Sequence, residues 1–168
     1  MTFNVRVSEE LIFEQVELNS QEEAISLLAD ALKGQGFVKK DYKKAILRRE
    51  KEYPTGLPSL PPMVAIPHAD YNLVKQTSIA VATLKKPIVF YNMESPEQKL
   101  DIYIVIMLAI SEPHGQIEML QKIITLVQNK QLKDIILNSN KKRILSVFKK
   151  EVLAEYDINI KGMKSFSE

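Results

Sequence analysis

Histidine is the residue type in this sequence best suited to covalent chemistry, and the chain has two, His68 and His114. His68 follows the apolar run Met63–Ile66 and Pro67, where a predicted strand reaches a loop. Proline fixes its own φ and restricts the residue before it, so the backbone leading into His68 has little freedom. One nitrogen of a neutral imidazole can act as a nucleophile while a hydrogen bond holds the other. This setting suits His68 as a nucleophile, but a lone histidine after a strand is more often a partly buried turn residue.

The composition excludes several other kinds of chemistry. The chain has no cysteine, which excludes disulfides, thiolate zinc sites and cysteine nucleophiles. Two histidines supply too few strong ligands for a closed zinc site, so we expect no metal. The five glycines form no phosphate-cradling loop, so we expect no nucleotide or other cofactor. A net charge of +2, spread along the chain, argues against a nucleic-acid partner.

The sequence predicts a protein without membrane insertion. The N-terminus lacks a basic region followed by an apolar stretch, so we expect no signal peptide. The longest apolar run, near 102–110, is too short to cross a bilayer. Together with the missing cysteines, these features favour a cytoplasmic location.

Apolar periodicity predicts helices, then strands, then helices. The serine of Ser20–Glu23, followed three residues later by glutamate, has the form of a capping box and predicts a helix start. The predicted helices are 20–32, 41–53, one after Pro113, 132–137 and 141–152; the predicted strands are 63–66, 78–84, 88–91 and 100–109. This order predicts an α/β fold whose mixed, mostly buried β-sheet is flanked by helices on both sides.

The chain reads as one domain, residues 1–155, followed by a polar C-terminal tail, residues 156–168, that we expect to fray. Residues 54–62 contain four prolines and predict a rigid irregular loop. Thr55 in this loop is either a hydroxyl donor near His68 or a turn residue.

Several segments together resemble a known family. Val64–Ala69 resembles the V-A-[IL]-P-H-[GTA] signature of enzyme IIA in the fructose/mannitol superfamily of the phosphotransferase system, the type-2 IIA domain. Arg49–Leu57 is similar to the R-E-x-x-x-P-T-G-L segment of that family. The resemblance extends over about residues 5–150. The P-T-G-L, A-I-P-H-x-D and F-x-x-M segments most resemble the galactitol-type branch.

The resemblance implies a phosphotransferase that works through a phosphohistidine, in a kinase-like phosphoryl relay. His68 would accept a phosphoryl group on its distal ring nitrogen from the carrier HPr and pass it to a cysteine of an enzyme IIB. A membrane enzyme IIC would then import the sugar, galactitol in the branch named above. Because this chain has no cysteine, we expect the IIB acceptor on a separate polypeptide.

The resemblance places Arg49 beside the active histidine. A guanidinium there would offer paired donors to phosphoryl oxygens and offset their charge. The alternative is that Arg49, like its neighbour Arg48, is a solvated charge at a helix end.

Many members of the family have a second active-site histidine that precedes apolar residues four, seven and eleven positions on. Gln116 fits this register, with Leu120, Ile123 and Val127, whereas His114 does not. We therefore expect Gln116 to bind the phosphoryl group or to orient His68. His114 is either a loop neighbour of the site or simply exposed.

Docking partners that release quickly use small interfaces, so we expect an apolar patch around His68. Pro61, Pro62, Met63 and Ile66 are its candidates, although Met63 and Ile66 also suit the core. Two alternatives to a transport role remain: a regulatory IIA-like phosphoprotein that signals nutrient state, and a binding module in which His68 is structural.

Overall fold

The computed structural model describes residues 4–154 and 157–160. Helices and strands follow one another in the order β1 (Asn4–Val7), the 3-10 helix η1 (Glu9–Leu11), β2 (Ile12–Val16), α1 (Gln21–Gly34), α2 (Tyr42–Glu52), β3 (Gly56–Leu57), β4 (Met63–Ala65), the 3-10 helix η2 (Tyr71–Leu73), β5 (Ser78–Tyr91), β6 (Lys99–Ala109), α3 (Pro113–Val127), α4 (Lys130–Asn138), α5 (Lys141–Glu151) and β7 (Asp157–Ile160). No helix among these described residues is long and apolar enough to span a membrane.

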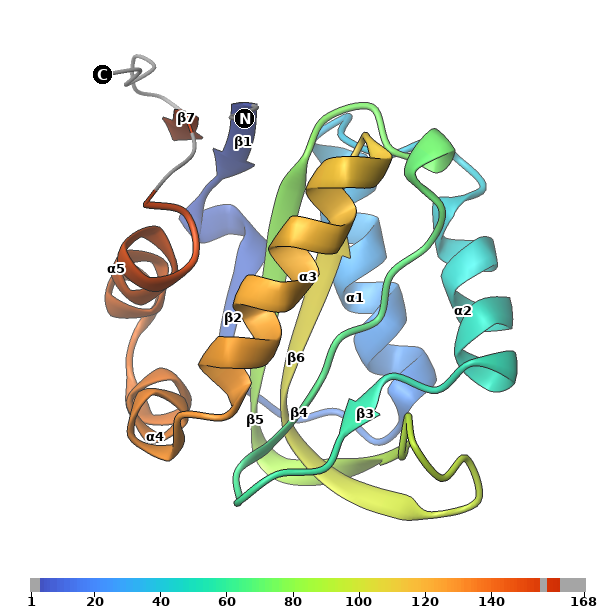
Figure 1. Ribbon diagram of the computed structural model, residues 1–168, viewed down its shortest axis with the longest axis vertical. Helices are drawn as coiled ribbons and strands as arrows, with labels where there is room; N and C mark the ends of the chain where they lie inside the picture. The colour runs from blue at the N-terminus through green and yellow to red at the C-terminus, as the bar shows by residue number, and fades with distance from the viewer. Residues whose placement is uncertain (1–3, 155–156, 161–168) are drawn as a thin grey trace.

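One mixed sheet organises the fold (Figure 1). Its strand order is β3-β4-β6-β5-β1-β7, and β2 also pairs with β5. The long hairpin β5–β6 is antiparallel, as is the short pair β3–β4, whereas β4 runs parallel to β6 and β1 parallel to β5. Because β4 lies beside the central strand β6, the loop that follows β4 starts from the middle of the sheet.

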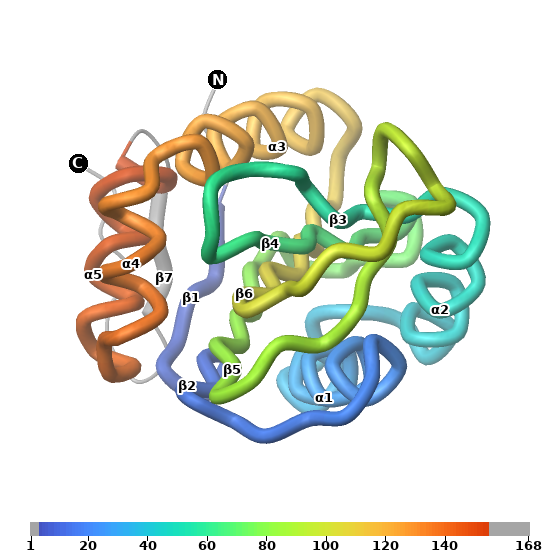
Figure 2. The backbone as a smooth tube through the Cα atoms, turned by 90° about the horizontal axis from the view of Figure 1, so that it is seen from below, coloured from blue at the N-terminus to red at the C-terminus, as the bar shows by residue number. Residues whose placement is uncertain are grey.

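Helices cover both faces of the sheet, which confirms the predicted fold class (Figure 2). Alternate residues of β6 point to opposite faces, as the pleat requires. Ile104 and Ile106 join the core under α3, α4 and α5, while Val105 and Met107 join the core under α1 and α2. The central strand is therefore buried on both faces, as its apolar sequence indicates.

Two helices begin where the sequence predicts. The Ser20 side chain accepts a hydrogen bond from the Glu23 N–H and caps α1, and Pro113 occupies the first turn of α3. The two strands predicted at 78–84 and 88–91 form one strand, β5, with a register shift opposite β6. The short strands β1 and β2 are not among the predicted elements.

Two expectations about irregular segments are wrong. Residues 54–62 are not irregular throughout, because Gly56–Leu57 form β3 and pair with β4. Residues 157–160 of the expected tail form β7, which pairs in parallel with β1. The tail's residues 156 and 161–168 lie outside the described residues. Pairing with a neighbouring strand supplies the backbone partners that no local sequence pattern encodes.

Gly56 shows why the P-T-G-L segment needs a glycine. A Cβ atom at this position would lie 2.6 Å from the Tyr91 carbonyl oxygen, closer than real Cβ contacts. The Gly56 carbonyl accepts a hydrogen bond from the Met93 N–H at 2.8 Å. This close approach fastens the segment between α2 and β4 to the end of the β5–β6 hairpin.

Candidate functional site

His68 lies just beyond β4, and the sheet holds the backbone around it. The Leu108 N–H donates to the Pro67 carbonyl at 3.2 Å, and His68 forms an isolated parallel bridge with Leu108 of β6. The buried Tyr42 hydroxyl of α2 donates to the Leu108 carbonyl at 2.9 Å. His68 is thus carried on backbone that pairs with β6, and Tyr42 of α2 holds the Leu108 carbonyl of that strand.

A hydrogen bond fixes the tautomer of the His68 ring. Its Nδ1 atom lies 2.9 Å from the Ile66 carbonyl oxygen. A carbonyl oxygen only accepts hydrogen bonds, so Nδ1 carries the ring proton in the neutral imidazole. The distal nitrogen, Nε2, therefore keeps its lone pair and is the nucleophilic atom.

The surroundings of His68 favour its neutral form. Burial lowers the pKa of the imidazole below its ordinary value, the Ile66 carbonyl raises it, Arg49 lowers it and Asp70 raises it. The effect of burial is the largest of these, so the pKa lies below 6.5. A neutral ring at neutral pH is the form that can attack an electrophile.

Arg49 reaches the same site from α2. Its Nη1 atom lies 3.5 Å from a carboxylate oxygen of Asp70, two residues beyond His68. The guanidinium carbon lies 5.8 Å from the centre of the Tyr53 ring. The Arg49 Nε atom is buried and has no hydrogen-bond partner. The guanidinium therefore lies against Asp70 in the loop that follows His68, with donor capacity for an anion.

A cleft opens between α2 and the segment that follows His68. Its lining includes Arg48, Arg49, Tyr53, Ala69 and Asp70. Arg48 thus borders the same cleft, but of the two arginines only Arg49 affects the pKa of His68. Arg49, the arginine that the motif indicates, is therefore the one whose charge acts on the imidazole.

Thr55 does not offer its hydroxyl to the cleft. The Thr55 side chain is buried, and its hydroxyl donates to the Glu50 carboxylate at 2.8 Å. The Thr55 N–H donates to the other Glu50 oxygen at 2.7 Å. Burial raises the pKa of Glu50 to about 7, although the Thr55 donors and Arg49 lower it. Thr55 is linked to the site through its backbone, because its carbonyl accepts from the Ile66 N–H.

The two candidates on α3 lie in different settings. The Gln116 side-chain amide donates to the Ala69 carbonyl at 3.1 Å, so Gln116 contacts the residue after His68. His114 is exposed in the first turn of α3. Glu112 caps this turn by accepting from the Gly115 N–H. Of these two residues, the structure brings Gln116 to the loop that carries His68.

The exposed apolar residues near the site differ from those expected. Pro62 and Ile66 are buried, and Met63 packs against the core beneath α1 and α2. Met63 begins β4 and Ile66 follows its last residue, and the two side chains pack into the two cores on opposite faces of the sheet. Of the expected four, Pro61 alone is exposed.

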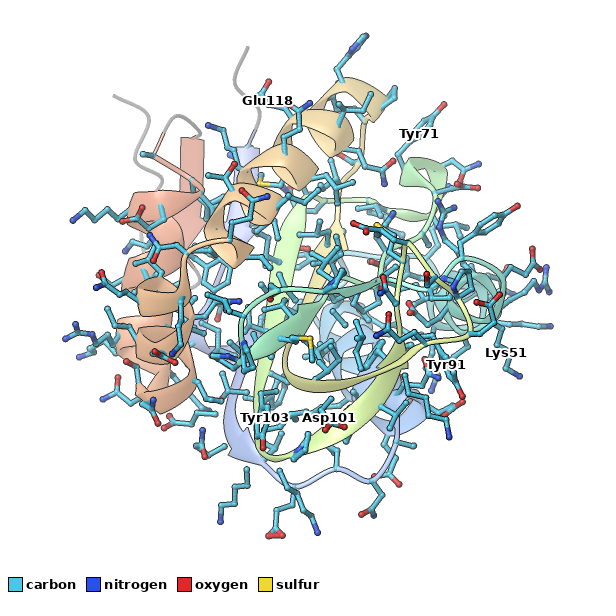
Figure 3. The ribbon with its side chains drawn as sticks, turned by 60° about the horizontal axis from the view of Figure 1, so that its bottom comes forward. Lys51, Tyr71, Tyr91, Asp101, Tyr103 and Glu118 are labelled. Atoms are coloured by element: carbon cyan, nitrogen blue, oxygen red, sulfur yellow. The ribbon has the colours of Figure 1, made fainter. Side chains whose placement is uncertain are left out.

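Three other side chains supply exposed apolar surface around the site. Tyr53 is 64% exposed, Tyr71 44% and Ile117 62%. Tyr53 lies beside Arg49, Tyr71 belongs to η2 three residues after His68, and Ile117 follows Gln116. Figure 3 shows the Tyr71 side chain projecting away from the body of the protein. These residues come from three separate elements, which is why no single sequence window reveals them.

Sequence reasoning left Glu50 and Asp70 without roles. Both lie inside motifs that were recognised, R-E and A-I-P-H-x-D, and each stands one or two residues from an assigned residue. Their positions in those motifs were the available signal. Among the described residues, no group of three or more histidine and acidic side chains could hold a metal ion.

Solved structures of similar shape support the fold. A protein described as a PTS IIA (PtxA) from Streptococcus mutans superimposes with a TM-score of 0.70 at 20% identity, over 88% of this chain and 92% of that chain. Enzyme IIA for mannitol from Escherichia coli, solved in complex with phosphorylated enzyme IIB, gives 0.66 at 22% identity, over 82% and 93%.

Sequence comparison gives the family. The transcriptional regulator ManR of Bacillus subtilis (strain 168) is 42% identical over 82 residues, which are 49% of this chain and 12% of the regulator. This chain therefore matches only a small part of that relative's length. Residues 6–151 match the family model described as phosphoenolpyruvate-dependent sugar phosphotransferase system, EIIA 2. A match over this much of the chain shows that the protein belongs to the EIIA type-2 family of the sugar phosphotransferase system.

Proposed function

We propose that this protein is a phosphoryl carrier and that His68 holds the phosphoryl group on Nε2. The observation that carries the proposal is the bond between Nδ1 and the Ile66 carbonyl, because it leaves Nε2 as the nucleophile. The lowered pKa keeps that nitrogen unprotonated at neutral pH. Membership of the EIIA type-2 family supports phosphoryl relay in general.

The donor in this proposal is the phosphohistidine of HPr. The Nε2 lone pair of His68 attacks the phosphorus, a new N–P bond forms, and the N–P bond of the donor breaks as its imidazole leaves. Charge builds on the phosphoryl oxygens during this step, and the Arg49 guanidinium stabilises it with its N–H donors. Gln116 holds the Ala69 backbone beside the reacting ring.

The acceptor is a cysteine thiolate of an enzyme IIB. Its sulfur attacks the phosphorus, the bond to Nε2 breaks, and His68 returns to the neutral Nδ1–H form. The sequence contains no cysteine, so this thiolate lies outside these 168 residues. The protein would act in the cytoplasm, and a membrane IIC would import the sugar. The galactitol-type resemblance makes a polyol the first substrate to test.

The exposed side chains of Tyr53, Tyr71 and Ile117 suit a docking face for both partners. Together they place apolar surface around a charged centre, which is typical of transient interfaces with small apolar areas. Donor and acceptor would use this face in turn, because each must bring its reacting atom to Nε2.

A regulatory role is the second candidate, and the similarity to ManR supports it. In that case phosphorylated His68 would report nutrient state, and the phosphoryl group would not continue to a sugar.

Purified, phosphorylated protein mixed with enzyme IIB in a galactitol system separates these roles. A role in transport predicts that the phosphoryl group leaves His68 when IIB is added and is recovered bonded to the cysteine sulfur of IIB. A phosphohistidine that persists beside several purified IIB proteins would favour regulation. Failure of HPr to label the protein at all would contradict both roles.

A further inference from the structure

A chain of hydrogen bonds links the buried Glu50 side chain to the His68 ring. The Glu50 carboxylate accepts from the Thr55 N–H at 2.7 Å and from the Thr55 hydroxyl at 2.8 Å. The Thr55 carbonyl accepts from the Ile66 N–H at 3.1 Å. The Ile66 carbonyl then holds the His68 Nδ1 atom at 2.9 Å. Thus two residues, Thr55 and Ile66, connect a carboxylate of α2 to the imidazole.

Burial makes these bonds strong constraints. Glu50 is 5% exposed, Thr55 2% and Ile66 0%. Burying a carboxylate without hydrogen-bond donors is strongly unfavourable. The Thr55 N–H and hydroxyl supply those donors, so the position of Glu50 on α2 determines where Thr55 lies.

The position of Thr55 in turn orients Ile66. Their hydrogen bond continues the ladder of β3 and β4, in which Gly56 pairs with Ala65. Ile66 precedes Pro67, which restricts its backbone. The Ile66 carbonyl therefore has little freedom to turn away from the ring once Thr55 is fixed.

Through this chain of hydrogen bonds Glu50 fixes the position of the backbone of Thr55 and Ile66, and its charge is not passed on to the His68 ring. The N–H and carbonyl groups of Thr55 belong to different peptide units, and so do those of Ile66. Polarisation along one continuous row of peptide units is therefore not available. What Glu50 controls is the location of two backbone segments, and this depends on the length of its side chain and on its acceptor atoms.

We propose that Glu50 is a positioning residue that keeps the His68 ring in the Nδ1–H tautomer with Nε2 free. The neighbouring residues Arg49 and Glu50 of α2 then have different roles. Arg49 acts on the imidazole through its charge, and Glu50 acts through the backbone of Thr55 and Ile66. The consequence for phosphoryl transfer rests on the proposed function, whereas the consequence for the ring does not.

Four variants of the full chain test the proposal. Glu50→Ala removes the acceptor, Glu50→Asp keeps the charge but shortens the reach, and Glu50→Gln keeps the length without the charge. Glu23→Ala is the matched control, because Glu23 also accepts a backbone N–H, from Asn19 at 3.1 Å, but on the exposed surface of α1. The readouts are the ¹⁵N shifts of the two ring nitrogens of His68 and the initial rate of labelling by phosphorylated HPr.

We expect the wild-type ring and that of Glu23→Ala to be in the Nδ1–H form. Glu50→Ala and Glu50→Asp should bring the two ¹⁵N shifts together, as a mixture of tautomers, and slow labelling about 10-fold. This is the low end of what loss of a group that orients a functional histidine costs in metal sites. Glu50→Gln should restore both readouts, because its carboxamide oxygen can accept from the Thr55 N–H.

Ring shifts in Glu50→Asp that match wild type would overturn the proposal, as would a Glu50→Gln variant as impaired as Glu50→Asp, since charge would then be decisive. The comparison of these two variants remains informative if Glu50→Ala does not fold. If HPr labels no form of the protein, the proposed function fails, but tautomer changes in the expected order still support the role of Glu50.

Discussion

Arg49 Nη1 lies 3.5 Å from the Asp70 carboxylate, and these two residues act on His68 with opposite signs. Arg49 lowers the pKa of the imidazole and Asp70 raises it. Each charge also limits the effect of the other, because the ion pair holds them close together. The site therefore pairs an anion-binding group with a local counter-charge when no phosphoryl group is present.

Removing either charge should move the pKa of His68 in a defined direction. Arg49→Ala should raise the pKa, because a repelling cation is lost, and Asp70→Asn should lower it, because an attracting anion is lost. An NMR titration of the ring protons measures both. Shifts of the same sign in the two variants would contradict this assignment.

Arg49→Ala should also slow labelling by HPr about 100-fold, the cost of removing one transition-state donor.

Labelling of His68 by phosphorylated HPr should continue at mildly acidic pH. Because burial lowers the pKa of His68, the ring should become protonated at a lower pH than an ordinary imidazole does. The initial rate of labelling should therefore begin to decline at a lower pH than the titration of an ordinary histidine would give.

The same shift predicts a change in folding stability. Unfolded chains bind this proton more readily than the folded protein, so stability should fall as the pH drops below 6.5 through the folded pKa. His68→Gln should lose this part of the pH dependence in chemical denaturation. A wild-type titration midpoint above 6.5 would contradict both expectations.

Gln116 and His114 should differ in their importance. Gln116→Ala removes the hydrogen bond to the Ala69 carbonyl and should slow labelling several-fold, about the effect of one neutral hydrogen bond. His114→Ala removes an exposed side chain and should change the rate by less than about twofold. Stopped-flow labelling by phosphorylated HPr compares them. A larger loss in His114→Ala than in Gln116→Ala would overturn the register argument.

Gly56→Ala should destabilise the protein. The added methyl group would lie 2.6 Å from the Tyr91 carbonyl oxygen, so backbone must shift, which typically costs about 1–3 kcal/mol. Gly34→Ala is the matched control, since its Cβ would meet no atom within 4 Å. Thermal unfolding should show a lower Tm for Gly56→Ala alone. Equal Tm values for both variants would mean that the close approach at Gly56 carries no strain.

Sequence reasoning reached the parts of this fold that local patterns encode. Ser20 and Pro113 mark helix starts through bonds and φ values set within one turn, so α1 and α3 could be predicted. The strand β3 could not, because it is only two residues long within a proline-rich segment, and β7 could not, because it exists through its pairing with β1 near the other end of the chain.

The same distinction holds for the site. Arg49, His68 and Gln116 were proposed because their motifs or register single them out, and the structure brings them to one region. Glu50 was missed because its contacts are with the backbone of Thr55, which is not a property of residue type. Burial of Ile66 was left open because a residue between a strand and a loop can face either way.

The most direct test of the phosphoryl-carrier account is to find the atom that HPr labels. Phosphorylated HPr is mixed with the wild-type protein, and the product is studied by mass spectrometry and by ¹⁵N NMR of its histidine rings. The account predicts one acid-labile phosphoryl group, bonded to Nε2 of His68, and none on the His68→Ala variant. A phosphoryl group on Nδ1, on His114 or on any other side chain would contradict it.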